Sequence, residues 1–92
     1  MFSVLVEAGI MERIHTLPHQ EAASLKKRLR LLKVNPFPDG GDKKEIKGSQ
    51  RSAYRLRVGR YRFFYLIDTE KKLVKVTEFL TAEQAHKKYR LV

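Results

Sequence analysis

The segment from Lys43 to Tyr65 constrains the fold of this chain more than any other part of the sequence. It contains eight of the twenty lysines and arginines but a single acid, Glu45. Residues 54–58 read Tyr-Arg-Leu-Arg-Val, so apolar and basic side chains alternate with a period of two. This period is typical of a strand that buries one face and exposes the other. The exposed face is cationic, which favours a partner that carries phosphate groups.

The same segment predicts a β-hairpin. Gly59 and Arg60 separate the alternating strand, 53–58, from a second run rich in aromatic residues, 61–67. Two such runs joined by two residues that include a glycine are a hairpin signature. After a polar turn, a third run at 73–79 extends the hairpin into a three-stranded antiparallel meander.

The N-terminal half predicts a short strand followed by two helices. Residues 2–6 are β-rich, and residues 8–16 carry apolar side chains at helical spacing. Pro18 interrupts this pattern and suits the first turn of a second helix of about four turns. The apolar residues of that helix recur every three or four positions, so it buries one stripe. These residues are Ala22, Leu25, Leu29 and Leu32.

A loop and a terminal helix complete the predicted elements. Residues 35–48 are expected to form a loop, because the Asn-Pro-Phe-Pro-Asp-Gly-Gly sequence that opens it contains two prolines and two glycines. Near the other end of the chain, Thr81 and Gln84 form a capping box ahead of a basic helix at 82–90.

These elements predict an α+β fold in one domain, residues 1–92. The N-terminal strand and the meander form a mainly antiparallel sheet of four strands, and the hairpin of two N-terminal helices packs on one of its faces. A short C-terminal helix ends the fold. The sequence contains no repeat, low-complexity tract or composition shift that would indicate a domain boundary.

Alternation assigns side chains to the two faces of this sheet. We expect the exposed face to carry Arg55, Arg57 and Arg62, beside an exposed Phe64, while the longer apolar set faces the helices. A slip of one residue in the strand register would invert the assignment. The predicted core residues are Tyr54, Leu56, Val58, Tyr61, Phe63, Tyr65 and Ile67.

Composition narrows the class of protein. With 42% hydrophobic and 33% charged residues, the chain is expected to be soluble and globular. The absence of cysteine excludes a disulfide scaffold and thiolate metal sites, and the N-terminus lacks the basic leader of a signal peptide, so we expect a cytoplasmic protein. The net charge of +10 favours nucleic acid, an acidic protein or an anionic membrane surface as the partner.

The combination of these features resembles the RelE/ParE superfamily of toxins from toxin–antitoxin pairs. The resemblance extends over nearly the whole chain, and the Asn-Pro-Phe-Pro turn, Lys47-Gly48 and the run YRLRVGRYRFFYLID carry it. RelE-like members cut messenger RNA in the ribosomal A site, whereas ParE-like members poison DNA gyrase. The resemblance favours the RelE branch and implies an endoribonuclease without metal or other cofactor, in which the 2′-hydroxyl attacks the adjacent phosphate.

The resemblance also implies which residues contact the reacting phosphate. Arg62 matches the arginine that binds this phosphate in the family, and Arg55 and Arg57 match two basic positions on the preceding strand. Guanidinium groups grip phosphate oxygens in pairs, which suits stabilisation of charge. They are poor proton acceptors, because arginine stays protonated. From the residues alone, the three arginines could equally be solvated strand residues.

The terminal helix is expected to supply the proton chemistry. Tyr89 matches a tyrosine of this helix in RelE-like enzymes, where it stacks on a base or moves a proton; it could also anchor the helix to the sheet. A second arginine usually follows the last strand in the ribonucleases, but none occurs at 78–83. We therefore expect His86 or Lys87 to replace it, although His86 could be a surface histidine.

Further contacts with RNA are expected from basic residues and one aromatic residue around the same face. These residues are Lys47, Arg51, Arg60, Phe64, Lys87 and Lys88. Basic residues of this kind contact the RNA backbone through salt-dependent interactions.

The resemblance and the charge together imply the partners. We expect the ribosome, its messenger RNA and an acidic, RelB-like antitoxin that covers the basic face, and no membrane. Two alternative functions remain open at this point. One is a ParE-like inhibitor of gyrase, and the other is a non-catalytic or inactive RNA-binding member of the fold, which the absent second arginine favours.

Overall fold

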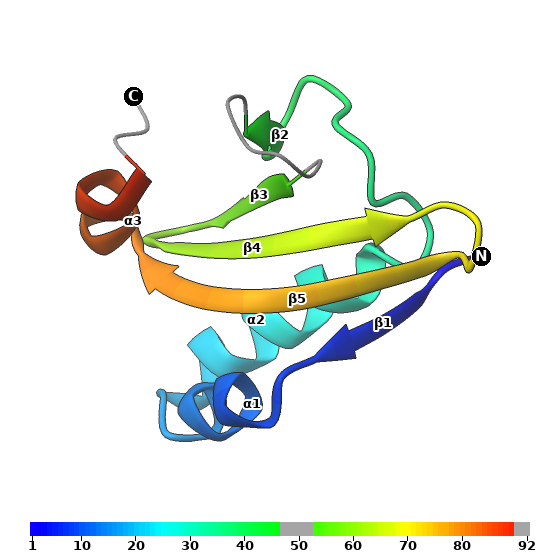
Figure 1. Ribbon diagram of the computed structural model, residues 1–92. Helices are drawn as coiled ribbons and strands as arrows, with labels where there is room; N and C mark the ends of the chain where they lie inside the picture. Colours follow the sequence, from blue (N-terminus) through cyan, green and yellow to red (C-terminus); the bar gives the residue numbers. More distant parts are fainter. Residues whose placement is uncertain (47–52, 90–92) are drawn as a thin grey trace.

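A computed structural model describes residues 1–46 and 53–89 of the 92-residue chain. The chain order of its elements confirms the predicted order, with one additional strand (Figure 1). The elements are β1 (Ser3–Val6), α1 (Ala8–His15), α2 (His19–Leu31), β2 (Lys43–Ile46), β3 (Ala53–Val58), β4 (Tyr61–Asp68), β5 (Leu73–Thr81) and α3 (Ala82–Tyr89).

The strands form one sheet of five, in the order β1-β5-β4-β3-β2. Only the β1–β5 pair is parallel, so the α+β class and the mainly antiparallel sheet are confirmed. The predicted count of four strands was wrong, because β2 lies inside the predicted loop. This strand is a charged edge strand with a single apolar residue, Ile46, so it shows no hydrophobic alternation that would mark it in the sequence.

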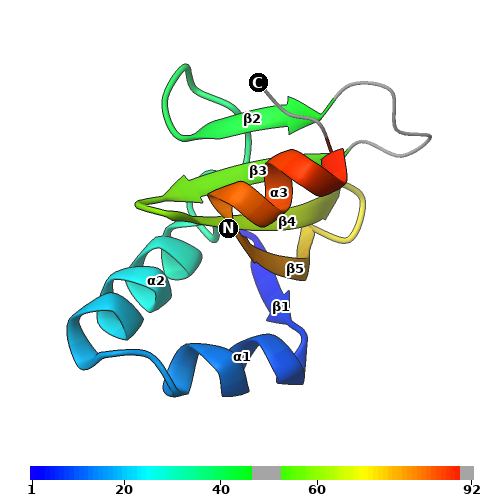
Figure 2. The ribbon, with the colours of Figure 1, turned by 90° about the vertical axis from the view of Figure 1, so that its left-hand side faces the viewer.

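The core lies between one face of the sheet and the helices α1 and α2, as predicted (Figure 2). Direct pairing of Leu56 with Phe63 and of Val58 with Tyr61 places these side chains on that face. From the helices, Ile14 and Leu25 are almost fully buried against them. All seven residues predicted for the core lie in this cluster or pack against it.

The turn between β3 and β4 fixes this register. Gly59 adopts a φ of 56°, a left-handed conformation that side chains disfavour and that a two-residue hairpin turn requires. The backbone carbonyl of Arg60, the next residue, accepts a hydrogen bond of 2.8 Å from the N–H of Ala82. The start of α3 is thereby attached to the hairpin turn.

The first residues of α3 form the predicted capping box. Thr81 Oγ1 accepts a hydrogen bond of 3.1 Å from the N–H of Gln84, and Gln84 Oε1 accepts one of 3.0 Å from the N–H of Thr81. The helix then contacts β4 and β5 on the face opposite α1 and α2 (Figures 1 and 2). We call this second face the open face; it is partly covered by α3.

The loop after α2 is attached to the core by a buried tyrosine. The Tyr65 hydroxyl donates a hydrogen bond of 2.7 Å to the carbonyl oxygen of Pro36, and both residues are almost fully buried. Burial raises the pKa of Tyr65, so its hydroxyl keeps the proton that it donates. The ring of Tyr54 stacks on that of Tyr65, with centroids 5.6 Å apart.

Replacing Tyr65 with phenylalanine should lower the free energy of unfolding by about 1–3 kcal/mol, because the Pro36 carbonyl then stays buried without a donor. Tyr54→Phe is the matched control, since the ring of Tyr54 stacks on that of Tyr65, and the change should alter stability by about 0.5 kcal/mol or less. Urea unfolding of the two variants measures the difference. Equal stability of both would show that the Pro36 bond contributes nothing.

Candidate functional site

The three arginines predicted for the exposed face lie together on the open face. Arg57 pairs directly with Arg62 across β3 and β4, and Arg55 pairs with Phe64 one step along the same hairpin. Directly paired residues of antiparallel strands have their side chains on one face. We call Arg55, Arg57 and Arg62 the arginine cluster. Lys44 of β2 pairs with Arg55 and adds a further cation beside it.

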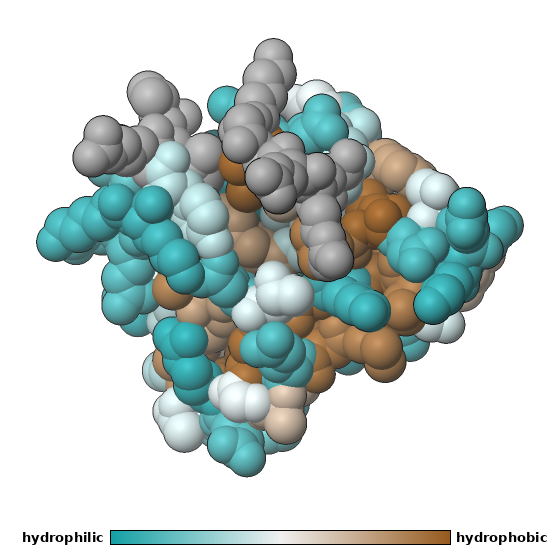
Figure 3. All heavy atoms as spheres, in the orientation of Figure 1, coloured by the Kyte–Doolittle hydropathy of each residue, from teal (hydrophilic) through white to brown (hydrophobic). Residues whose placement is uncertain are grey.

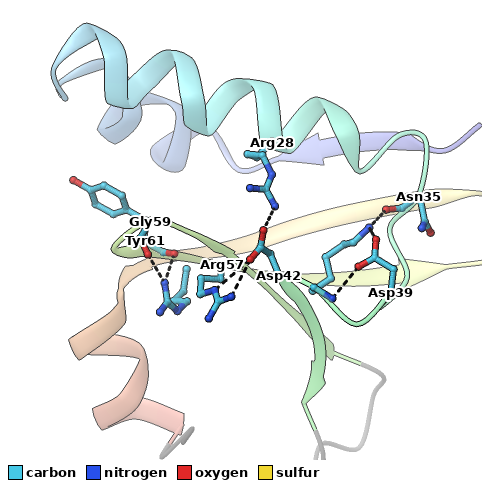
Figure 4. A network of polar contacts seen from close by, with 10 residues as sticks. Arg28, Asn35, Asp39, Asp42, Arg57, Gly59 and Tyr61 are labelled. Carbon is cyan, nitrogen blue, oxygen red and sulfur yellow. Dashed lines mark hydrogen bonds and ion pairs between the residues drawn. The ribbon is translucent and has the colours of Figure 1, made fainter.

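Asp42 holds one member of the arginine cluster at the sheet edge (Figure 4). Its Oδ1 accepts hydrogen bonds from Arg57 Nη2 at 3.1 Å and Nε at 3.3 Å, and its Oδ2 accepts one from Arg28 of α2 at 2.7 Å. These two guanidinium groups hold the pKa of the Asp42 carboxyl below its usual value. Asp42 directly precedes β2, so its ion pair with Arg28 links α2 to the start of that strand. The Asp42 carbonyl oxygen also accepts a hydrogen bond of 2.9 Å from the N–H of Arg57 on β3.

Arg62 is held by the backbone instead. Its Nη1 donates to the carbonyl oxygens of Gly59 at 2.9 Å and Tyr61 at 2.8 Å, both at the hairpin turn (Figure 4). Neutral carbonyls orient the guanidinium group but do not neutralise its charge. Within residues 1–46 and 53–89, no carboxylate lies within ion-pair distance of Arg62 or Arg55.

Arg55 and Arg62, which have no carboxylate partner among the described residues, are also partly buried. Arg55 Nε is buried and has no hydrogen-bond partner among the described residues. Burial, followed by repulsion from Arg57, lowers the pKa of Arg55; burial, followed by repulsion from Arg55 and Arg57, lowers that of Arg62. Both groups stay protonated near neutral pH. Clustered like charges with an unsatisfied donor favour the binding of an anion, which would supply the missing acceptors.

The terminal helix brings a tyrosine and a carboxylate to the same face. The Tyr89 ring packs on that of Phe64, with centroids 4.5 Å apart, and the Tyr89 hydroxyl donates a hydrogen bond to Glu78 Oε1. Lys88 Nζ donates to Glu78 Oε2. Glu78 itself pairs with Phe64 across β4 and β5, so it lies on the open face. Tyr89 therefore anchors the helix to the sheet, and stays half-buried at its surface.

The prediction that Phe64 is exposed for stacking was wrong. Only 3% of this residue is exposed, because α3 crosses the open face and the Tyr89 ring covers it. Alternation places Phe64 on the open face correctly, but it does not show that a helix distant in the sequence covers that part of the face. The aromatic ring available beside the arginine cluster is that of Tyr89.

The remaining predicted residues are not all brought to this site. Arg60 turns toward the helical side, where its Nη2 lies 3.3 Å from Glu21 Oε1 of α2 and its guanidinium group lies over the Tyr61 ring. Lys47 and Arg51 lie outside the described residues. His86, Lys87 and Lys88 are exposed on α3. Lys87 forms an exposed ion pair of 3.5 Å with Glu83.

Sequence reasoning missed two acids and one base of this site. Asp42 and Lys44 fall in the predicted loop, where no pattern pointed to a strand. Glu78 lies in a predicted strand, but a register shift opposite Phe64 and Tyr65 disturbs the alternation there. The only sequence signal for Glu78 was its position, within the segment where the second arginine is absent.

On the open face, hydrophilic and hydrophobic side chains gather over different elements. Hydrophilic side chains gather over α3, whereas hydrophobic ones gather over the sheet at the opposite side (Figure 3). In the described residues, no helix is long and apolar enough to cross a membrane. The same residues contain no group of three or more histidine, cysteine or acidic side chains placed to hold a metal ion.

Comparison with known proteins gives matches over nearly the whole chain. No protein-family model matches the sequence. The chain is 28% identical over 87 residues to a protein of Methanocaldococcus jannaschii named RelE1 and assigned as a toxin, with 94% of this chain and 96% of that protein covered.

Solved structures match the fold. A chain of the RelE–RelB complex from Pyrococcus horikoshii superimposes with a TM-score of 0.76 at 21% identity, covering 87% of this chain and 93% of that one. The isolated RelE toxin of E. coli gives a TM-score of 0.70 at 18% identity, covering 96% and 98% of the two chains. The fold is that of the RelE structures, and the sequence match to RelE1 of M. jannaschii bears out the resemblance to RelE-like toxins.

Replacing Arg55 with methionine should raise the free energy of unfolding by about 0.5–2 kcal/mol, because it removes a partly buried charge that repels Arg57 and has an unsatisfied donor. Arg57→Met removes the same charge together with the Asp42 pair. It should therefore leave stability unchanged or lower it by about 1 kcal/mol or less. Urea unfolding compares the two variants, and a destabilised Arg55→Met protein would contradict the view that its charge is uncompensated.

Proposed function

We propose that this chain is the toxin of a RelBE-type toxin–antitoxin pair and cleaves messenger RNA on the ribosome. The similarity to RelE1 of M. jannaschii and to RelE chains solved in complex with RelB antitoxins supports the toxin class. The observation that carries ribonuclease activity is the arginine cluster, in which Arg55 and Arg62 have no carboxylate partner within the described chain. A phosphate can bind there without displacing an ion pair.

The reaction needs little covalent chemistry from the protein. The 2′-oxygen of a nucleotide attacks its own 3′-phosphate, a new bond from the 2′-oxygen to phosphorus forms, and the bond to the 5′-oxygen breaks. The products are a 2′,3′-cyclic phosphate and a 5′-hydroxyl end. The pentacoordinate phosphate carries more charge on its oxygens than the substrate does, and Arg62 and Arg55 stabilise that charge. Because the nucleophile belongs to the substrate, metal-bound water is not required.

The leaving 5′-oxygen needs a proton. Arginine is a weak donor because it stays protonated, and the second arginine of the family is absent from residues 78–83. His86 and Lys87 lie exposed on α3, the helix that carries Tyr89 to the open face. Either can give a proton to the 5′-oxygen, because an imidazolium and an ammonium group both carry N–H donors.

The partners follow from charge. A chain of net charge +10 associates readily with ribosomal and messenger RNA, and this association weakens as salt rises. The ribosomal substrate places the protein in the cytoplasm. An acidic antitoxin of the RelB type would cover the arginine cluster and supply the carboxylates that Arg55 and Arg62 lack.

The absence of the second arginine favours a second candidate function. A member of this fold without an efficient proton donor could inhibit by binding alone, either on RNA or, like the ParE branch, on DNA gyrase. This candidate predicts growth inhibition that leaves messenger RNA intact.

Arg62→Ala should abolish growth arrest and lower the cleavage of messenger RNA on programmed ribosomes by about 100-fold or more, because transition-state charge loses its main donor. Arg60→Ala is the matched control: it removes the same charge two residues away, but Arg60 pairs with Glu21 on the helical side, so cleavage should stay within about threefold of the wild type. Primer extension on the messenger RNA measures both.

The same experiment separates the candidates. A fully toxic, folded Arg62→Ala protein would contradict cleavage by this site. Wild-type protein that arrests growth with intact messenger RNA and a DNA-damage response would instead identify a gyrase inhibitor.

A further inference from the structure

The proposed reaction leaves one proton without a destination, the one on the attacking 2′-hydroxyl. The arginine cluster cannot take it, because guanidinium groups are protonated already. Beside the cluster, the described residues place two carboxylates, Asp42 and Glu78. Asp42 is bound on both oxygens by Arg57 and Arg28, which stabilise its ionised form and make it a poor proton acceptor.

Glu78 has a different environment. Its two hydrogen-bond partners are the neutral phenol of Tyr89 and the ammonium group of Lys88. Its side chain is 23% exposed, so it can reach a bound ligand without being fully solvated. The Tyr89 ring is fixed on Phe64, and these contacts leave the carboxylate with a defined orientation.

The strand register places Glu78 in line with the arginine cluster. Arg55, Phe64 and Glu78 form one row across β3, β4 and β5, and Arg62 lies in the next row on β4. Neighbouring strands are about 4.8 Å apart, so the backbone of Glu78 lies about 10 Å from that of Arg55. The ribose next to a phosphate held by Arg55 and Arg62 would lie beside Tyr89, whose ring covers Phe64.

We propose that Glu78 is the proton acceptor of the reaction and acts through the Tyr89 hydroxyl. The inference rests on the proposed ribonuclease function. The 2′-hydroxyl proton passes to the Tyr89 oxygen while the proton of Tyr89 passes to Glu78, so tyrosinate never forms. The 2′-oxygen bonds to phosphorus, the 5′-oxygen leaves with a proton from His86 or Lys87, and Glu78 then returns its proton to solvent.

The charged groups around Glu78 suit this role. From α3 it contacts Lys88 and Tyr89; on the open face of the sheet, β5 also carries Lys75, and the arginine cluster lies on β3 and β4. One oxygen of Glu78 is bound by the neutral phenol of Tyr89, whereas both oxygens of Asp42 are bound by guanidinium groups, so Glu78 keeps an oxygen that can accept a proton through Tyr89. A glutamate in this position supplies a base that an arginine could not.

The test is single-turnover cleavage on ribosomes programmed with messenger RNA, across pH 5 to 9. Glu78→Gln keeps the size of the side chain and an acceptor for Tyr89, but it removes the basic oxygen. We expect its rate to fall by about 100-fold or more. The rate of Glu78→Gln should depend more steeply on hydroxide concentration than the wild-type rate, because solvent must then take the proton that the carboxylate no longer accepts.

Three comparisons make the result decisive. Glu70→Gln, the same change at an exposed turn residue away from the cluster, should leave rate and pH profile unchanged. Formate should restore part of the activity of Glu78→Ala by replacing the missing carboxylate. Thermal unfolding of each variant shows whether α3 remains docked. The cleavage rate of Tyr89→Phe should fall by a factor similar to that of Glu78→Gln, because this change removes the hydroxyl that passes the proton to Glu78.

Each outcome supports or overturns the inference. A Glu78→Gln protein with the wild-type rate and profile overturns it and leaves the proposed function intact. If Glu78→Gln does not fold, the formate rescue of Glu78→Ala and the rate of Tyr89→Phe still decide. Wild-type protein that does not cleave messenger RNA overturns the proposed function first.

Discussion

The register of the β3–β4 hairpin is the constraint on which the rest of the structure depends. The left-handed conformation of Gly59 fixes the turn, and the turn fixes which residues pair. With this register Tyr61, Phe63 and Tyr65 face α1 and α2, and all three arginines of the cluster face away. A shift of one residue would bury three guanidinium groups in the core, so the same register determines both the hydrophobic core and the position of the arginine cluster.

The consequences extend beyond the hairpin through single contacts. Asp42 joins the arginine cluster to α2 and to the start of β2, and the carbonyl of Arg60 holds the first N–H of α3. Arg55 and Arg62 are the exceptions, because nothing in the described chain neutralises them. The fold tolerates this repulsion at the open face, where a phosphate or an acidic partner segment can relieve it.

Most of the fold could be predicted from the sequence, and the reasons are local. Apolar and basic residues alternate in β3, aromatic residues mark β4, Pro18 separates the first two helices, and Thr81 with Gln84 marks the start of α3. Strand β2 could not be predicted because its pairing with β3 depends on a partner and not on its own composition. Phe64 and Glu78 were misjudged or missed for a similar reason: their environment is set by α3, which arrives from the end of the chain.

The strand order has a consequence for synthesis of the protein. In the sheet, β5 lies between β1 and β4, but it is synthesised after all the other described strands. The edge strand β1 pairs only with β5 in the described sheet. Closing the β1–β5 pair joins segments about seventy residues apart, which is a slow, non-local step. The sheet and the helix that completes the open face can therefore assemble only after β5 and α3 have been synthesised, so the arginine cluster reaches its final surroundings in the last stage of folding.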